Sequence, residues 1–113
     1  MTDPIADAAA RKGSAELLVL ATLADTEMHG YDLCRTIAER SDGVLTFRVA
    51  SIYPVLYRLE DRGWIEGTWR QVGGRRRRMY RLTAAGRKAL VQKRTRWASF
   101  IGALSRAAGL RHA

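Results

Sequence analysis

Apolar residues recur at helical spacing through the first part of the chain. Ser14 is a favourable N-cap and Glu16 follows in the first turn, where a negative charge suits the positive end of the helix dipole. The pattern therefore predicts a helix from Ser14 to about Ala24. After the polar break at residues 25–27, a second apolar stripe predicts a helix over about residues 29–41, and its members are Leu33, Cys34, Ile37 and Ala38. Both helices are expected to be structural, with their apolar side chains buried.

A third helix is predicted for residues 51–62, with Gly63 as its stop, although Pro54 lies near its start. If Ser51 is the N-cap, Pro54 occupies the third helical position, where a backbone N–H has no intrahelical partner to lose. The predicted buried stripe is Ile52, Val55, Leu56 and Leu59. The remaining side chains of the first turns are polar or aromatic: Ser51, Tyr53, Pro54, Tyr57 and Arg58. This helix end suits phosphates and base edges, and the alternative is that its tyrosines are half-buried edge residues.

Residues 64–82 change to a period of two, and Gly73 and Gly74 separate two extended runs. This pattern predicts a β-hairpin with a two-residue loop. The loop sets the register, which pairs Trp69 with Arg78, Gly67 with Tyr80 and Ile65 with Leu82. One face of the hairpin is then expected to pack against the helices, and it carries Ile65, Trp69, Tyr80 and Leu82.

Four consecutive arginines, Arg75, Arg76, Arg77 and Arg78, follow the hairpin loop and face Arg70, with no acid expected nearby. Like charges opposite one another disfavour a free hairpin. Guanidinium groups beside a double glycine are suited to binding phosphates, and a merely solvated tip is the alternative.

A long last helix is predicted from Ala84 toward Ala107, with Thr83 as its cap, at roughly 36 Å for 1.5 Å per residue. Its apolar side chains form a heptad-like seam that Arg94 interrupts and Phe100 broadens, with members Leu90, Trp97, Ile101, Leu104 and Ala108. The seam needs a partner, and a second copy of the chain is the economical one. Trp97, Phe100 and Ile101 are expected to form either dimer core or a platform for planar ligands between two subunits.

Composition adds a strong charge asymmetry to this picture. The 113 residues have a net charge of +9, yet residues 1–66 contain seven bases and eleven acids, whereas residues 67–113 contain thirteen bases and no acid. Such segregation favours a polyanionic partner, nucleic acid more than a membrane surface. The length indicates one domain, and residues 1–11 read as a flexible segment without the features of a secretion signal, so we expect a cytoplasmic protein.

Several other functions lack the residues they need. Cys34 lies on an apolar stripe and is interpreted as a core residue, and His29 as part of the turn into the second helix. We find no nucleophile with a base, no paired carboxylates and no metal-ligand set, so neither an enzyme nor a metal or other cofactor is expected. No membrane contact is expected either, because the basic and apolar residues of the last helix cluster in different halves.

Three helices followed by a two-stranded hairpin is the order of a winged helix-turn-helix, and several motifs resemble the PadR family of bacterial transcriptional regulators across about residues 12–100. The motifs are Lys12-Gly13-Ser14, Met28-His29-Gly30-Tyr31, Ser51-Ile52-Tyr53-Pro54-Val55-Leu56, Arg62-Gly63-Trp64-Ile65-Glu66-Gly67, and the run from Arg76 through Tyr80-Arg81-Leu82-Thr83 to Gly86. The single helix that follows the hairpin is similar to the compact subgroup of that family.

The resemblance implies a mainly α fold with a small β-hairpin: a winged helix-turn-helix over residues 12–83 and a dimerisation helix and tail over residues 84–113. It implies a homodimeric repressor that binds a pseudo-palindromic operator and is relieved by a small aromatic or drug-like molecule. The matching residues are Ser51, Tyr53 and Arg58 on the recognition helix, Gly74, Arg75, Arg76 and Arg77 at the wing tip, and Trp97 to Ile101 on the dimer helix. The alternative is a nucleic-acid-binding module without a regulatory role, either architectural or RNA-binding.

Overall fold

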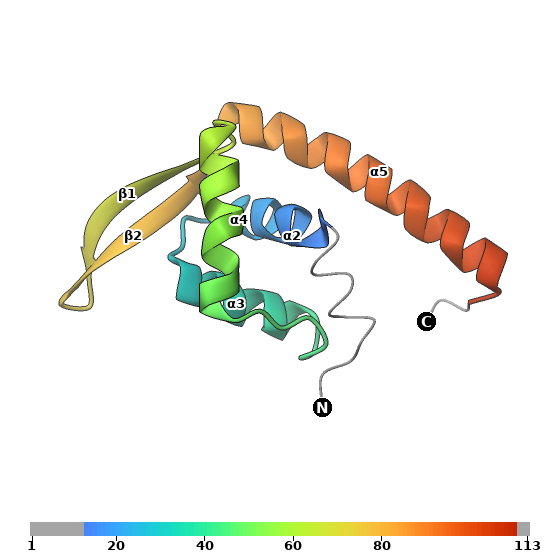
Figure 1. Ribbon diagram of the computed structural model, residues 1–113, viewed down its shortest axis with the longest axis horizontal. Coiled ribbons are helices and arrows are strands. Elements are labelled where there is room, and N and C mark those ends of the chain that lie inside the picture. The colour runs from blue at the N-terminus through green and yellow to red at the C-terminus, as the bar shows by residue number, and fades with distance from the viewer. Residues whose placement is uncertain (1–12, 111–113) are drawn as a thin grey trace.

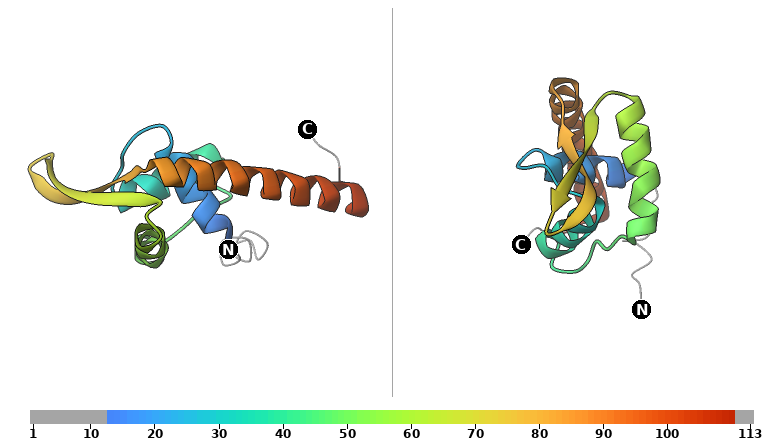
Figure 2. Two further views of the ribbon diagram at one scale, coloured as in Figure 1. Left: turned by 90° about the horizontal axis from the view of Figure 1, so that it is seen from above. Right: turned by 90° about the vertical axis from the view of Figure 1, so that its left-hand side faces the viewer.

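The computed structural model describes residues 13–110, and its elements extend in two directions from a small helical body (Figure 1). The elements are α2 (Ala15–Leu23), α3 (Gly30–Arg40), α4 (Val49–Asp61), β1 (Ile65–Val72), β2 (Arg75–Leu82) and α5 (Ala84–Ala108). The hairpin projects from one side of the body and α5 from the other (Figure 2). This confirms the mainly helical fold with a small hairpin, whereas the flexible segment predicted for residues 1–11 lies outside the described residues.

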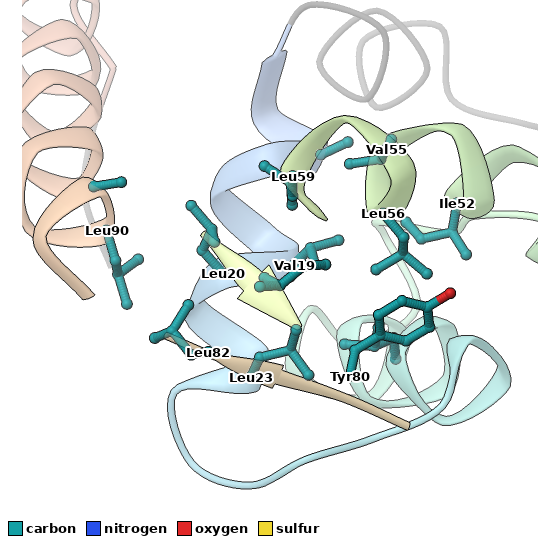
Figure 3. Packing of buried hydrophobic residues seen from close by; sticks show 14 of the residues in the cluster. Val19, Leu20, Leu23, Ile52, Val55, Leu56, Leu59, Tyr80, Leu82 and Leu90 are labelled. Carbon is teal, nitrogen blue, oxygen red and sulfur yellow. The ribbon is translucent and has the colours of Figure 1, made fainter. Parts of the chain in front are cut away.

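The core forms where α2, α3, α4 and the inner half of the hairpin meet (Figure 3). The predicted stripe of α4 is buried as expected, and Tyr80 of β2 packs against it with no exposed surface. Full burial of a large apolar side chain contributes about 1.5–3 kcal/mol. The largest fully buried side chains are those of Tyr80, Leu20, Leu33, Ile52, Leu56, Leu59, Val19 and Thr22. Because one face of α4 is committed to this core, its other face is available for recognition.

The start of α4 differs from the prediction. The N-cap is Arg48, not Ser51, and the Arg48 carbonyl accepts hydrogen bonds from the N–H groups of Ser51 at 2.9 Å and Ile52 at 3.2 Å. Pro54 therefore lies inside the helix, at its sixth residue rather than its third, and cannot donate to the Ala50 carbonyl one turn earlier. The two bonds to Arg48 hold the first turn although no side chain caps it. This start therefore leaves no capping signal in the sequence.

The hairpin has the predicted register, with Ile65 opposite Leu82, Gly67 opposite Tyr80 and Trp69 opposite Arg78. The prediction that Trp69 packs in the core is wrong, because its side chain is 55% exposed. The strands extend beyond the helices, so only their inner half reaches the core (Figure 1). Trp69 packs instead under the guanidinium groups of Arg76 and Arg78, whose Cζ atoms lie 5.1 and 5.7 Å from its ring centroid.

Of the two helices before α4, α3 has a side-chain cap and α2 does not. His29 caps α3: its Nδ1 accepts a hydrogen bond from the Asp32 N–H at 3.3 Å, which confirms its role in the turn. Ser14 precedes α2 as predicted, but its side chain makes no capping bond. Cys34 is buried, and burial raises the pKa of its thiol, which agrees with a core residue.

Helix α5 has the predicted length and start. The Thr83 hydroxyl accepts a hydrogen bond from the Gly86 N–H at 3.1 Å, and Gly109 ends the helix with a left-handed backbone, φ 69°. Ala89 and Leu90 pack on the core, but the outer half of the helix extends away from the body (Figure 2). No helix among residues 13–110 has the length and apolarity required to span a membrane.

Candidate nucleic-acid interface

A cleft of about 530 Å³ lies between α4, the start of α3 and the hairpin. Its walls combine aromatic rings with guanidinium groups, and the residues that matter here are Tyr31, Tyr53, Tyr57, Trp69, Arg76 and Arg77. Figure 2 shows α4 and the hairpin side by side, so the cleft lies between the helix and strands that the sequence assigned to recognition and to the wing. The fold thus places the two predicted binding elements on one surface.

The tyrosines form the helical wall of the cleft. The rings of Tyr53 and Tyr57 lie 6.0 Å apart, and Tyr31 reaches the cleft from the first turn of α3. Gly30 permits the close approach of α3 and α4, because a Cβ there would lie 3.2 Å from Tyr53 Cζ. A tyrosine has an apolar body and a polar tip, which suits contacts to sugars and phosphates. Tyr31 was missed as a site residue, although the motif Met28 to Tyr31 contained it.

Tyr80 forms part of the cleft floor and fastens the hairpin to the helices. Its backbone exchanges two hydrogen bonds with Met28, of 2.8 and 3.1 Å. Its buried hydroxyl has no hydrogen-bond partner in the described part of the chain, and burial raises the pKa of this group. Tyr80 therefore ties this part of the floor to the helices, and its hydroxyl stays uncharged at neutral pH.

The hairpin arginines divide into paired and unpaired groups. Arg78 lies 2.8 Å from Glu60 of α4, and Arg70 lies 2.9 Å from Glu27. The prediction that no acid lies near these arginines is wrong, because folding brings acids from distant parts of the chain to the strands. Both side chains of the Arg78–Glu60 pair are partly buried, so Arg78 holds the hairpin against α4 rather than offering a free charge.

Arg75, Arg76 and Arg77 form the free charge of the tip. Among residues 13–110, no acidic side chain lies within ion-pair distance of these three. Gly73 and Gly74 turn the chain with positive φ angles of 57° and 77°, a conformation that disfavours other residues. The loop therefore carries three adjacent guanidinium groups away from the body, as a phosphate-binding prong requires.

The predicted residues of α4 do not all meet in the cleft. Tyr53 lines it, whereas Ser51 is exposed in the first turn of the helix. Arg58 lies on the side toward α2, with its Nε 3.7 Å from a carboxylate oxygen of Glu16. The structure thus groups Tyr53 with Arg76 and Arg77 and leaves Arg58 on a separate part of the helix.

The aromatic residues of α5 lie on the other projection of the molecule. The rings of Trp97 and Phe100 meet edge to face at 6.0 Å, and with Arg96 they line a shallow hollow of about 290 Å³. Phe100 is 57% exposed and Ile101 is 50% exposed. These apolar residues therefore have no cover within the chain and belong to a different surface from the cleft.

Acidic, histidine and cysteine side chains do not gather at either surface. In the part of the chain that the structure describes, no three such residues lie close enough together to hold a metal ion. The charged groups of the cleft are all cationic. Three helices, a hairpin wing and a cationic cleft between wing and third helix define a winged-helix DNA-binding protein.

Comparison with known proteins shows the family. The Transcriptional regulator PadR-like family matches residues 19–92, and the chain belongs to this family. It is 37% identical over 86 residues to Transcriptional regulator Rv3488 of Mycobacterium tuberculosis. The aligned region covers 74% of this chain and 76% of the relative. The chain is thus a transcriptional regulator and not an enzyme.

Solved structures agree with this assignment. The fold is similar to a PadR-like transcriptional regulator from Bacillus cereus, with a TM-score of 0.76 and 26% identity over 88% of this chain and 95% of the other. It is also similar to Bacillus subtilis PadR in complex with operator DNA, with a TM-score of 0.64 and 28% identity. That match covers 70% of this chain and 45% of the longer PadR chain.

Proposed function

We propose that this regulator binds a pseudo-palindromic operator as a homodimer, with α4 in the major groove and the hairpin wing along the phosphate backbone. The observation that carries the proposal is the cleft in which Tyr53 and Tyr57 of α4 face Arg76 and Arg77 of the wing. Tyrosine hydroxyls, and guanidinium groups that no carboxylate pairs with, can donate hydrogen bonds to phosphate oxygens. The likeness to Bacillus subtilis PadR in complex with operator DNA supports the same use of the fold.

The two parts of this surface have different tasks. Arg75, Arg76 and Arg77 contact phosphates and supply affinity without regard to sequence. Ser51 and Tyr53, near the N-terminus of α4, reach toward base edges and set the register. Arg58 adds a contact from a separate part of the same helix, although in the free protein it lies near Glu16.

A second copy of the chain is the partner for the outer half of α5. A helix that stands alone in water is expected to expose polar side chains, but this half of α5 exposes apolar ones. They are Phe100, 57% exposed, Ile101, 50% exposed, and Leu104, 49% exposed. Pairing two copies about a two-fold axis buries this surface and places two α4 helices toward one duplex. Recognition helices of such dimers enter successive major grooves about 34 Å apart.

The proposed regulatory outcome is repression. A dimer seated on an operator in the cytoplasm blocks access to the promoter, so repression is the proposed effect. A small planar molecule relieves it by binding the hollow beside Trp97 and Phe100 in the dimer interface, where the rings are free to stack on a ligand. The ligand and DNA surfaces are then separate and are connected through α5.

Footprinting of the DNA upstream of the protein's own gene and its neighbours tests the proposal. We expect two protected half-sites that survive an excess of random duplex and of RNA, because base contacts add to the phosphate contacts. Equal competition by random duplex or by RNA would instead support an architectural or RNA-binding module, which shares the basic surface but reads no sequence.

Replacing Trp97 by alanine separates the two roles of the hollow. We expect Trp97→Ala to remain dimeric, because Phe100, Ile101 and Leu104 retain most of the apolar surface, and to lose the ligand-induced change in aromatic fluorescence. Sedimentation and titration with a panel of planar aromatic compounds provide the measurements, with Trp69→Phe as the matched control on the distant hairpin. Dissociation of the Trp97→Ala dimer would assign this tryptophan to the dimer core and contradict the ligand site.

A further inference from the structure

One carboxylate lies where three helices meet. Glu16, in the first turn of α2, is 12% exposed at its side chain and accepts a hydrogen bond from Arg62 Nη1 at 2.8 Å. Lys93 Nζ of α5 lies 3.2 Å from the same Oε1 oxygen. Arg58 of α4 lies 3.7 Å from the other oxygen. Glu16 therefore links the recognition helix to the helix that carries the proposed dimer surface.

Cations outnumber carboxylates at this junction. One carboxylate faces three cations, so Arg58, the most distant, is free to turn toward DNA while Arg62 and Lys93 keep the carboxylate paired. Burial raises the pKa of Glu16, but hydrogen bonds from Lys93 and Arg62 outweigh it and hold the pKa below its ordinary value. Glu16 is thus ionised throughout the neutral range, and the link is permanent.

A second set of contacts stiffens the same junction. Two of these cations also contact the Trp64 ring, with Arg62 Cζ 4.9 Å and Lys93 Nζ 5.5 Å from its centroid. The Trp64 carbonyl accepts a hydrogen bond from the Thr83 N–H at 3.1 Å, directly before α5. It also packs so closely on Gly86 that a Cβ there would lie 2.0 Å from its oxygen. Ionic and steric contacts therefore act together on the direction of α5.

We propose that Glu16 is a positioning residue that fixes the angle between α5 and α4, and that it thereby sets which spacing of operator half-sites the dimer accepts. The inference rests on the proposed dimeric DNA binding. In the dimer, α5 is the only element proposed to join the subunits, so the separation of the two recognition helices follows from the angle at which α5 leaves each body. Loosening that angle at Glu16 leaves each body able to bind a half-site but removes the preference for one separation.

The test compares operators whose half-sites are one or two base pairs closer together or farther apart than in the natural site. One base pair shifts a half-site by about 3.4 Å and rotates it around the duplex. We expect the native protein to prefer one spacing by about tenfold or more, and Glu16→Gln to reduce that preference to about twofold or less, each as a ratio of Kd values. Affinity of Glu16→Gln for an isolated half-site is expected to change by less than about threefold.

Two further variants make the result specific. Glu66→Gln removes an exposed ion pair to Arg81, at 3.2 Å, with the same change in net charge, and should keep the native spacing preference. Lys93→Met removes the ammonium group that joins α5 to Glu16 and to the Trp64 ring but keeps an apolar side chain of similar length beside that ring. It should therefore lose the preference even if Glu16→Gln folds poorly. The double variant Glu16→Gln with Lys93→Met should show no further loss, since both changes break the same link.

The outcomes separate the inference from the function on which it rests. If Glu16→Gln and Lys93→Met are less stable to heat but keep the native spacing preference, Glu16 has a structural role alone and the inference is overturned. If the native protein itself shows no preference among spacings, the proposed dimeric mode of binding fails instead.

Discussion

Replacing Arg75, Arg76 and Arg77 together by alanine is expected to weaken binding to every duplex by on the order of 10³-fold at physiological salt. These three side chains carry the unpaired charge of the wing tip, whereas Arg78 beside them is engaged by Glu60. If each subunit contacts about four phosphates, a dimer has a log–log salt slope near −7, and losing three contacts in each subunit flattens it to about −2. Fluorescence anisotropy titrations at several salt concentrations measure both quantities.

A matched variant distinguishes position from total charge. Replacing Arg87, Lys88 and Arg94 by alanine removes the same number of charges from exposed positions on α5, away from the wing tip. We expect this variant to lose affinity by less than about tenfold and to keep most of the native slope, since distant exposed charges are largely screened at this salt concentration. An unchanged slope in the wing variant, or equal losses in the two variants, would contradict the assignment of the wing.

An aspartate in place of Ile101 is expected to separate the subunits without unfolding them. Ile101 is half exposed and lies on the outer half of α5, beyond the contacts of Ala89 and Leu90 with the core. Burying an unpaired carboxylate twice in a two-fold interface costs several kcal/mol. We therefore expect dimer dissociation to become at least about a hundredfold more favourable, with a matching loss of affinity for the complete operator.

Sedimentation velocity and circular dichroism provide the two readouts for this change, subunit association and helix content. Ser99→Asp introduces the same charge two residues earlier, about 200° around the helix from Trp97, and should remain dimeric. Ile101→Asp should still bind an isolated half-site, because α4 and the wing are intact. A variant that stays dimeric and binds the operator normally would show that α5 is not the dimer helix.

The elements that local rules determine were predicted from the sequence. Gly73 and Gly74 readily adopt the positive φ angles of a two-residue loop, and this loop fixed the hairpin pairing residue by residue. Thr83 caps the start of α5 as predicted, because its hydroxyl accepts a backbone hydrogen bond. The end of α5 at Gly109 was not identified from the sequence. The predicted start of α4 was wrong, because the helix begins with backbone bonds to Arg48, whose side chain does not cap it. Ser51, the residue type that favours capping, lies inside the helix.

The parts that needed tertiary structure were not predicted. Trp69 lies at a position of the strand that alternation assigns to the core, but the strands extend beyond the helices and leave it exposed. Glu27 and Glu60 are far from the arginines in sequence, so their ion pairs with Arg70 and Arg78 became visible only in the fold. The candidate cleft was accordingly predicted in part: its arginines and Tyr53 were identified, whereas Tyr31 was not.

Cleavage of operator DNA by an iron chelate attached to α4 tests whether a dimer reads DNA through this helix. Ser51→Cys places an exposed thiol at the start of α4, and the native Cys34 is buried, with its thiol pKa raised by burial, so labelling is selective. We expect two clusters of cuts about one helical turn apart, each centred on a major groove of one half-site. A single cluster, or cuts spread evenly along the duplex, would contradict a dimer that reads DNA through α4.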